Sequence, residues 1–374
     1  MRTFTQLAAL AAVLASPSIA RAANPLCSSL PDPIVVAGSS AVGPFIKSMG
    51  TVLATQTTPT TLIYQKQGSC TGVNAVVADT TPAGACALGA CIKGTATYYD
   101  TAGTALTCDL DAAGTHVDVG LSDVWVDSCT GQLPPTGVQD FPGPVEAMLF
   151  VVPKAAQQVA ITAEEAYFVF GFGASGQAMP WVTETVLMVR NALSGTQQII
   201  AHAIAVPAGR WKGVDKGGSQ QVADAVAAAT MTDATLGILG ADFYDLHRDT
   251  LSALAFQGFH QRGAYYADST ATSFDKKNVR DGHYLAFGYL HLIAHVGVNN
   301  VPSTSASKRF VDWILGNTGT NGTAAPFDIT DVTIAAHLIP TCAMKVQRSS
   351  EGGALSRYSP ATSCAAHFEA TVGQ

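Results

Sequence analysis

The N-terminal third of this chain repeats one pattern three times: a short apolar run of strand length passes into a turn of small polar residues. The runs are Pro33–Ala37, Thr61–Tyr64 and Val117–Leu121. Apolar residues at helical spacing follow the first run, from Phe45 to Ala54, and a second helix is expected from Val73. Strands that alternate with helices form open α/β sheets, which bind ligands at the carboxyl edge of their strands.

The same alternation recurs in the middle of the chain. Ala147–Val152 is an unbroken apolar run typical of a buried strand, and Thr162 with Glu165 forms a capping box that predicts a helix through Phe170. Val186–Val189 predicts a further strand, which runs into Arg190. Because single hydrophobic cores seldom grow past about 250–300 residues, we expect the 374 residues to form two lobes.

The turns after these strands carry hydroxyls, unobstructed backbone N–H groups, one arginine and one aspartate. Glycine lets the main chain approach a ligand closely, and Ser or Thr at a helix start offers a hydroxyl and N–H groups to an anion. These groups favour a small tetrahedral oxyanion over a catalytic reaction. The four turns are Gly38–Pro44, Gly68–Gly72, Asp118–Asp123 and Arg190–Thr196.

The first 22 residues have the features of a secretory signal peptide. Arg2 precedes the apolar stretch Leu7–Leu14, and Ala20-Arg21-Ala22 supplies a cleavage site of small residues. Cys27 lies beyond the expected cut, so no lipid-bearing first cysteine is predicted. No later stretch reaches the roughly 18 apolar residues that a membrane helix needs. We therefore expect a soluble periplasmic or secreted protein.

Eight cysteines fit an oxidising compartment, although their spacing does not fix the connectivity. Cys342 and Cys364 have no other cysteine near them in sequence, so we expect them to pair. Cys91 and Cys108 flank a predicted hairpin (95–107), which favours a cross-strand disulfide between them. No Cys-x2-Cys pair is present, and we predict no metal site.

The net charge of −7 argues against nucleic acid or an anionic membrane surface as a partner. It does not argue against a small anion, because oriented dipoles and one arginine can hold an anion whatever the distant surface charge. We expect no cofactor and a monomeric protein.

Four motifs, taken in order, resemble the solute-binding proteins of bacterial phosphate importers, which have the type 2 periplasmic binding fold. In that family a Gly-rich strand end is followed by Tyr-Gln-x-x-Gly-Ser, Asp-x-Gly-x-Ser-Asp and Arg-x-x-x-Ser-Gly-Thr segments. The counterparts here are Gly38–Pro44, Tyr64–Ser69, Asp118–Asp123 and Arg190–Thr196. The family commonly has an acidic residue two positions after the arginine, where this chain has Ala192.

The resemblance implies an α/β protein of two lobes, each an open mixed sheet flanked by helices. Lobe 1 would comprise 24–144 and 276–374, with a Cys-rich insert at about 80–115 and a disulfide-held C-terminal tail, and lobe 2 would comprise 145–275. It also implies phosphate, or a related oxyanion, held between the lobes without chemistry, and an ABC permease as a partner. The implied ligand-binding residues are Ser39, Ser40, Ala41, Ser69, Asp123, Arg190, Ser194, Gly195 and Thr196.

Some motifs in the chain resemble other kinds of site. Gly171–Gly176 matches the dinucleotide-binding fingerprint in spelling but follows a predicted helix, so a loop is favoured. His291 and His295 have metal-ligand spacing for a helix, but the apolar stretch 285–296 is predicted to be a strand, which favours packing histidines. No Gly-x-Ser-x-Gly motif or catalytic triad is evident, so no enzyme is predicted. The long insert and the tail leave open the alternative of a secreted or surface-associated interaction protein with weak or no anion binding.

Overall fold

The computed structural model describes residues 23–80, 86, 90–318 and 322–372, and the predicted signal peptide lies outside them. Within this part of the chain, no helix has the length and apolarity needed to cross a membrane. The strands are β1 (Pro33–Gly38), β2 (Thr61–Lys66), β3 (Thr95–Tyr99), β4 (Ala105–Asp109), β5 (Val119–Ser122), β6 (Val138–Pro153), β7 (Ala160–Thr162), β8 (Leu187–Val189), β9 (Val214–Asp215), β10 (Leu236–Gly240), β11 (Leu251–Ala253), β12 (Ala255–Gln257), β13 (Phe287–His295), β14 (Val346–Gln347) and β15 (Ser356–Arg357).

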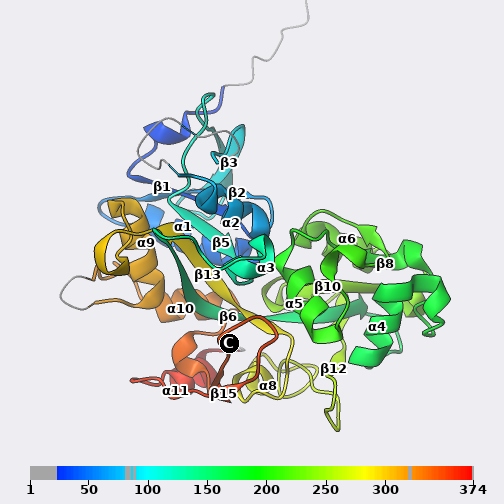
Figure 1. The fold of residues 1–374 in the computed structure, drawn as a ribbon. Coiled ribbons are helices and arrows are strands. Elements are labelled where there is room, and N and C mark those ends of the chain that lie inside the picture. The colour runs from blue at the N-terminus through cyan, green and yellow to red at the C-terminus, as the bar shows by residue number, and fades with distance from the viewer. Residues whose placement is uncertain (1–22, 81–85, 87–89, 319–321, 373–374) are drawn as a thin grey trace, which may run out of the picture.

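Helices flank this mixed sheet, which confirms the predicted α/β fold class (Figure 1). Their bounds are α1 (Gly43–Ala54), α2 (Ser69–Val77), α3 (Val126–Thr130), α4 (Ala163–Phe172), α5 (Gly195–Ile204), α6 (Ser219–Ala227), α7 (Ala241–Asp245), α8 (Lys277–Arg280), α9 (Ser305–Leu315), α10 (Ile329–Ala335) and α11 (Ala365–Thr371).

One continuous path of paired strands runs through the molecule in the order β4-β3-β2-β1-β5-β13-β6-β10-β8-β9. The long strand β6 carries this path from one half to the other. Its first part pairs antiparallel with β13, and its second part pairs antiparallel with β10 and β11. Figure 1 shows β6 between the body that holds β1, β2 and β5 and the body that holds β8 and β10. We call these bodies the first and second lobes; their division at residues 144/145 and 275/276 stays a prediction.

The parallel pairings place the predicted turns at common sheet edges. In the first lobe β1 pairs parallel with both β2 and β5. In the second lobe β10 pairs parallel with β8. Since parallel strands end at the same edge, the loops after β1, β2 and β5 gather on one lobe, and those after β8 and β10 gather on the other.

Buried apolar residues cover both faces of the first-lobe sheet. Phe45, Ile46, Met49 and Leu53 lie along one side of α1 and are all buried. Each such side chain contributes about 1.5–3 kcal/mol by leaving water, so this stripe fixes α1 against the sheet. The second-lobe core extends to the C-terminal segment, because Ile339, Met344 and Phe368 belong to the same buried cluster.

Four disulfides connect described cysteines, and one sequence-based pairing is wrong. Cys342 is bonded to Cys364, but Cys108 is bonded to Cys27 and Cys91 to Cys86. The hairpin register explains the correction, because Ala96, rather than Cys91, lies opposite Cys108. The N-terminal segment reaches β4 instead, through a bridge between Leu26 and Asp109. The fourth disulfide, Cys70–Cys129, ties the start of α2 to α3.

Most local predictions match the elements, with shifts at their ends. The capping box of Thr162 and Glu165 is present at α4. The helices expected from Val73 and Gln197 begin earlier, at Ser69 and Gly195, so the polar turn residues form their first turns. The tail from Thr341, which has no clear sequence period, holds the helix α11 and the short strands β14 and β15.

Gly72 permits a close contact between α2 and the first-lobe sheet, and we expect Gly72→Ala to destabilise the protein by about 2 kcal/mol. A Cβ there would lie 2.5 Å from the Ala37 carbonyl oxygen and 2.8 Å from that of Leu121. Overpacking against backbone costs up to about 3 kcal/mol, and helix propensity returns only about 1 kcal/mol. Urea unfolding measures the difference. Gly297→Ala is the control, because nothing lies within 4 Å of its added Cβ; equal stability of the two variants would contradict the prediction.

Candidate functional site

The first lobe contributes hydroxyls and amides at the ends of three strands. Ser39 follows β1, Ser69 begins α2 after β2, and Asp123 follows β5; all three are buried. The Ser69 hydroxyl donates to Asp123 Oδ2 at 3.1 Å, and the Ala41 amide donates to the Ser39 hydroxyl at 3.1 Å. Three segments that are separated in sequence thus meet at one edge of the sheet.

Arg190 follows β8 on the second lobe and reaches across to the first. Its side chain is buried, and Nη2 donates to the Ser40 hydroxyl at 3.2 Å. Nε donates to the Gly217 carbonyl and Nη1 to the Ser219 hydroxyl, each at 3.2 Å. The guanidinium is therefore held by three neutral oxygens, and Ala192 stands at the position where a carboxylate could have paired with it. Burial lowers the pKa of Arg190, and the charges of Asp123 and Asp215 oppose this.

The N-terminus of α5 faces the first-lobe residues directly. Ser194 caps the helix by accepting from the Gln197 amide, and the Gly195 amide donates to the Ser69 hydroxyl at 3.2 Å. A Cβ on Gly195 would lie 2.4 Å from Ser69 Oγ and 2.5 Å from Asp123 Oδ2. Only glycine allows the helix to approach so closely. The lobes are closed on each other here.

Two buried oxygens at this junction lack a hydrogen-bond partner among the described residues: Asp123 Oδ1 and Thr196 Oγ1. Burial raises the pKa of the Asp123 carboxyl, while hydrogen bonds from Ser39 and Ser69 and the charge of Arg190 lower it. A buried hydrogen-bond acceptor without a partner costs about 1–3 kcal/mol. Asp123 Oδ1 is therefore suited to accept a hydrogen bond from a ligand hydroxyl.

The structure thus brings the nine sequence-predicted positions to one junction between the lobes; their role in binding an anion stays a prediction. Sequence reasoning missed four neighbours. Tyr64 donates its hydroxyl to the Ser39 carbonyl, and Ser219 holds Arg190. Glu146 and Asp242 are buried carboxyls whose charges act on Asp123 or Tyr64. Asp242 could have been found, because it follows a strand end; Glu146, inside an apolar run, gave no such signal.

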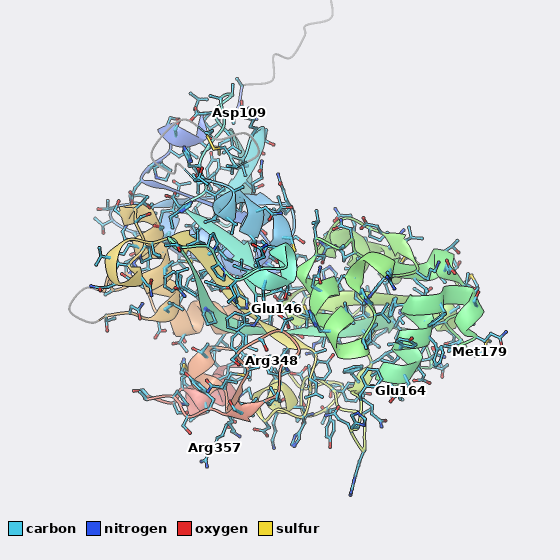
Figure 2. The ribbon with its side chains drawn as sticks, viewed as in Figure 1. Asp109, Glu146, Glu164, Met179, Arg348 and Arg357 are labelled. Atoms are coloured by element: carbon cyan, nitrogen blue, oxygen red, sulfur yellow. A yellow bond between two sulfur atoms is a disulfide. The ribbon has the colours of Figure 1, made fainter. Side chains whose placement is uncertain are left out.

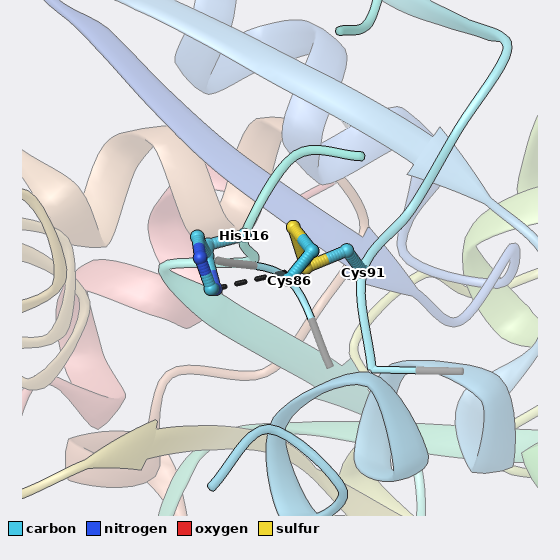
Figure 3. Close-up of side chains that lie close together, drawn as sticks. All are labelled: Cys86, Cys91 and His116. Carbon is cyan, nitrogen blue, oxygen red and sulfur yellow. Dashed lines mark hydrogen bonds between the residues drawn. A yellow bond between two sulfur atoms is a disulfide. The ribbon is translucent and has the colours of Figure 1, made fainter. Parts of the chain in front are cut away.

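A second cluster, in the Cys-rich insert, has side-chain atoms spaced closely enough to bind a metal ion, but two of its three residues are joined in a disulfide. Cys86 Sγ, Cys91 Sγ and His116 Nδ1 all lie within 4.8 Å of one another (Figure 3). The two sulfurs are joined in a disulfide, whereas metals bind cysteine as thiolate. His116 Nδ1 also lies 2.5 Å from Asp79 Oδ2. With the disulfide intact, this group stabilises the insert and offers no thiolate ligand.

His291 and His295 lie on β13, as the strand prediction requires. His291 is fully buried, its Nδ1 lies 2.6 Å from Asp140 Oδ1, and its ring contacts Trp125 at a centroid distance of 4.5 Å. This is a packing and hydrogen-bonding role. The Gly171–Gly176 segment ends α4 and forms a short 3-10 turn, so it does not begin the helix that a dinucleotide-binding motif needs.

Comparison with solved structures identifies the fold of this chain. No protein-family model matches the chain, and no curated protein matches it. A solved structure described as a phosphate ABC transporter substrate-binding protein from Clostridium perfringens, with bound phosphate, matches with a TM-score of 0.55 and 14% identity, covering 83% of this chain and 100% of that one. A human phosphate-binding apolipoprotein matches with a TM-score of 0.51 and 13% identity, covering 82% of this chain and 90% of that one. The chain therefore has the fold of these proteins.

Proposed function

We propose, from the fold that this chain shares with phosphate-binding proteins, that it captures phosphate or a similar tetrahedral oxyanion between its two lobes. The observation that carries the proposal is the junction itself. Donors from both lobes (the Ser39 and Ser69 hydroxyls, the Arg190 guanidinium and the α5 N-terminus) converge beside an unpaired carboxylate oxygen of Asp123. Charge-assisted hydrogen bonds and helix N-terminal amides are the groups that bind such anions.

An anion that bridges both lobes would favour their closed arrangement, which is how two-lobed binding proteins respond to ligand. Capture without chemistry fits a donor set of hydroxyls, amides and an arginine that meet at the junction of the lobes. The signal-peptide features of 1–22 favour a periplasmic or secreted protein. An ABC permease is the partner that this function implies.

Titration calorimetry of the purified protein with phosphate tests the proposal. We expect saturable 1:1 binding tighter than millimolar. Binding weaker than millimolar, or none, would contradict the proposal and leave the alternative of an interaction protein with this fold.

Asp123 is expected to distinguish a proton-bearing anion from sulfate. Asp123→Asn replaces the acceptor with an amide. We therefore expect the phosphate affinity to fall about tenfold or more, and the ratio of phosphate affinity to sulfate affinity to decrease. Parallel titrations of both proteins with phosphate and sulfate measure the ratio. Asp127→Asn, a change of the same chemistry on α3, is the control. An unchanged ratio in Asp123→Asn would remove Asp123 from this role.

A further inference from the structure

Two carboxyl groups that the proposed function does not use lie at the junction of the lobes. Glu146 is on β6 and Asp242 is in the first turn of α7, and both are buried. Figure 2 shows Glu146 where β6 passes from one lobe to the other. Asp242 comes from the second lobe, directly after β10.

The two groups lie against each other. The position that a Cβ on Gly240 would occupy is 1.9 Å from Glu146 Oε1 and 2.5 Å from Asp242 Oδ1. Each carboxyl acts on the titration of the other. Among the described residues, none of the four carboxyl oxygens has a hydrogen-bond partner. Two buried carboxylates this close repel each other, whereas a proton on one of them allows it to donate to the other.

The groups whose charges act most on this pair are acidic or phenolic, and one of them, Asp245, is itself paired with Lys276 Nζ at 2.7 Å. The facing titratable groups are Asp123 after β5, Tyr64 on β2 and Asp245 on α7. The strand partner of Glu146, Gly288, packs against the Asp123 backbone, with its added Cβ 2.6 Å from the Asp123 carbonyl oxygen. Glu146 and Asp242 therefore lie beside Asp123, the carboxylate that would contact the anion. A negative charge on the pair would act on Asp123 and on the anion.

We propose that Glu146 and Asp242 hold a proton between them, and that this proton allows the junction to accept an anion. The proposal rests on the proposed function. With the proton present, the anion meets Arg190 and Asp123 beside a pair of reduced charge. Without it, the pair carries two negative charges instead of one, and the closed lobes and the anion are both disfavoured. The protonation state of Glu146 and Asp242 would then determine whether the junction can bind the anion.

The sign of the pH dependence follows from burial. Burial and the neighbouring Asp242 raise the pKa of Glu146 well above its ordinary value, and burial raises the pKa of Asp242 to about 8. A raised pKa means that the folded protein keeps its proton at neutral pH. The added charge therefore appears only as the pH rises into the alkaline range. By linkage, the factor by which proton loss weakens anion binding equals the factor by which the anion strengthens proton binding.

Phosphate titrations from about pH 6 to about pH 9.5 test this in the full chain. Phosphate also loses a proton in this range, so the measured quantity is the change in affinity of the wild type relative to that of the double variant Glu146→Gln/Asp242→Asn. Neither amide can ionise, so this variant carries no titrating carboxyl at the pair. We expect the wild type to lose about tenfold more affinity than the double variant over this range. Glu164→Gln, at an exposed position on the outer face of the second lobe (Figure 2), should follow the wild type.

A second measurement keeps the proposal testable if phosphate does not bind. Infrared difference spectra of the protein alone should show a protonated-carboxyl band at neutral pH that disappears at alkaline pH. The double variant Glu146→Gln/Asp242→Asn should remove this band, because a single variant leaves one buried carboxyl whose pKa stays raised, and Glu164→Gln should not. Absence of the band, or equal pH profiles of phosphate affinity in wild type and the double variant, would overturn the proposal. Failure of phosphate to bind at any pH, with the band present, would overturn the proposed function and the link to the anion but leave the shared proton standing.

Discussion

Arg190→Ala should reduce phosphate affinity by at least about 100-fold. Arg190 is 4% exposed, and its guanidinium reaches from the second lobe to the Ser40 hydroxyl at the junction. Removing one partner of a buried charge–charge contact costs about 2–5 kcal/mol, and about 3 kcal/mol corresponds to 100-fold in Kd. Titration calorimetry with phosphate at neutral pH measures the change.

Arg210→Ala provides the matched control, because Arg210 lies on the same lobe and is exposed. It loses the same formal charge, so it also measures the long-range effect of net charge on anion capture. A second comparison, Arg190→Lys, keeps the charge but loses the fork that reaches Ser40, Gly217 and Ser219 together. Affinity of Arg190→Ala within a few fold of Arg210→Ala would exclude Arg190 from the anion site.

Gly195→Ala is expected to abolish tight binding while leaving the fold intact. The added Cβ would also lie 2.6 Å from the Asp123 Cβ, in addition to its overlap with the Ser69 hydroxyl. The first lobe and the α5 N-terminus could then no longer close to the distance that lets one anion contact both. Alanine favours helix formation by about 1 kcal/mol over glycine, so the second lobe should not be destabilised. We expect a loss of about 100-fold or more in phosphate affinity, of the size that misplacing bound groups by an ångström produces.

Small-angle scattering with and without phosphate complements the affinity measurement. Wild-type protein should become more compact on adding phosphate, and Gly195→Ala should not. Gly209→Ala is the control, since its added Cβ would have only the Ala192 Cβ within reach, at 3.9 Å. Wild-type affinity and compaction in Gly195→Ala would show that the close approach of α5 to Ser69 is unnecessary for capture.

The sequence predicted the parts of the site that are local. A strand, a small polar turn and a helix start are neighbours along the chain, so Ser39, Ser69 and Ser194 could be identified from spacing. The capping box at Thr162 and the strand that contains His291 are local in the same sense. Helix starts were predicted a few residues late at α2 and α5, because the hydroxyl-bearing turn residues themselves adopt the first helical turn.

Contacts between distant segments could not be predicted in this way. Cys108 pairs with Cys27 because the N-terminal segment lies along β4, which the hairpin sequence does not encode. Ala192 left open how Arg190 is held, and the answer lies in Gly217 and Ser219, which follow β9 on a different segment. Which residues become partners in these contacts depends on strand order and register. Strand order and register in turn depend on the packing of the whole lobe.

The amino-acid sequence by itself determined which groups this protein can offer to a ligand: hydroxyls, amides, one arginine and one aspartate at the ends of strands. Local backbone preference and apolar spacing are sufficient for that. Only the tertiary structure decided that Glu146, within an apolar strand, meets Asp242 beside Asp123. The crossing of β6 between the lobes brings these carboxyls out of water together, and burial and the neighbouring Asp242 both raise the pKa of Glu146.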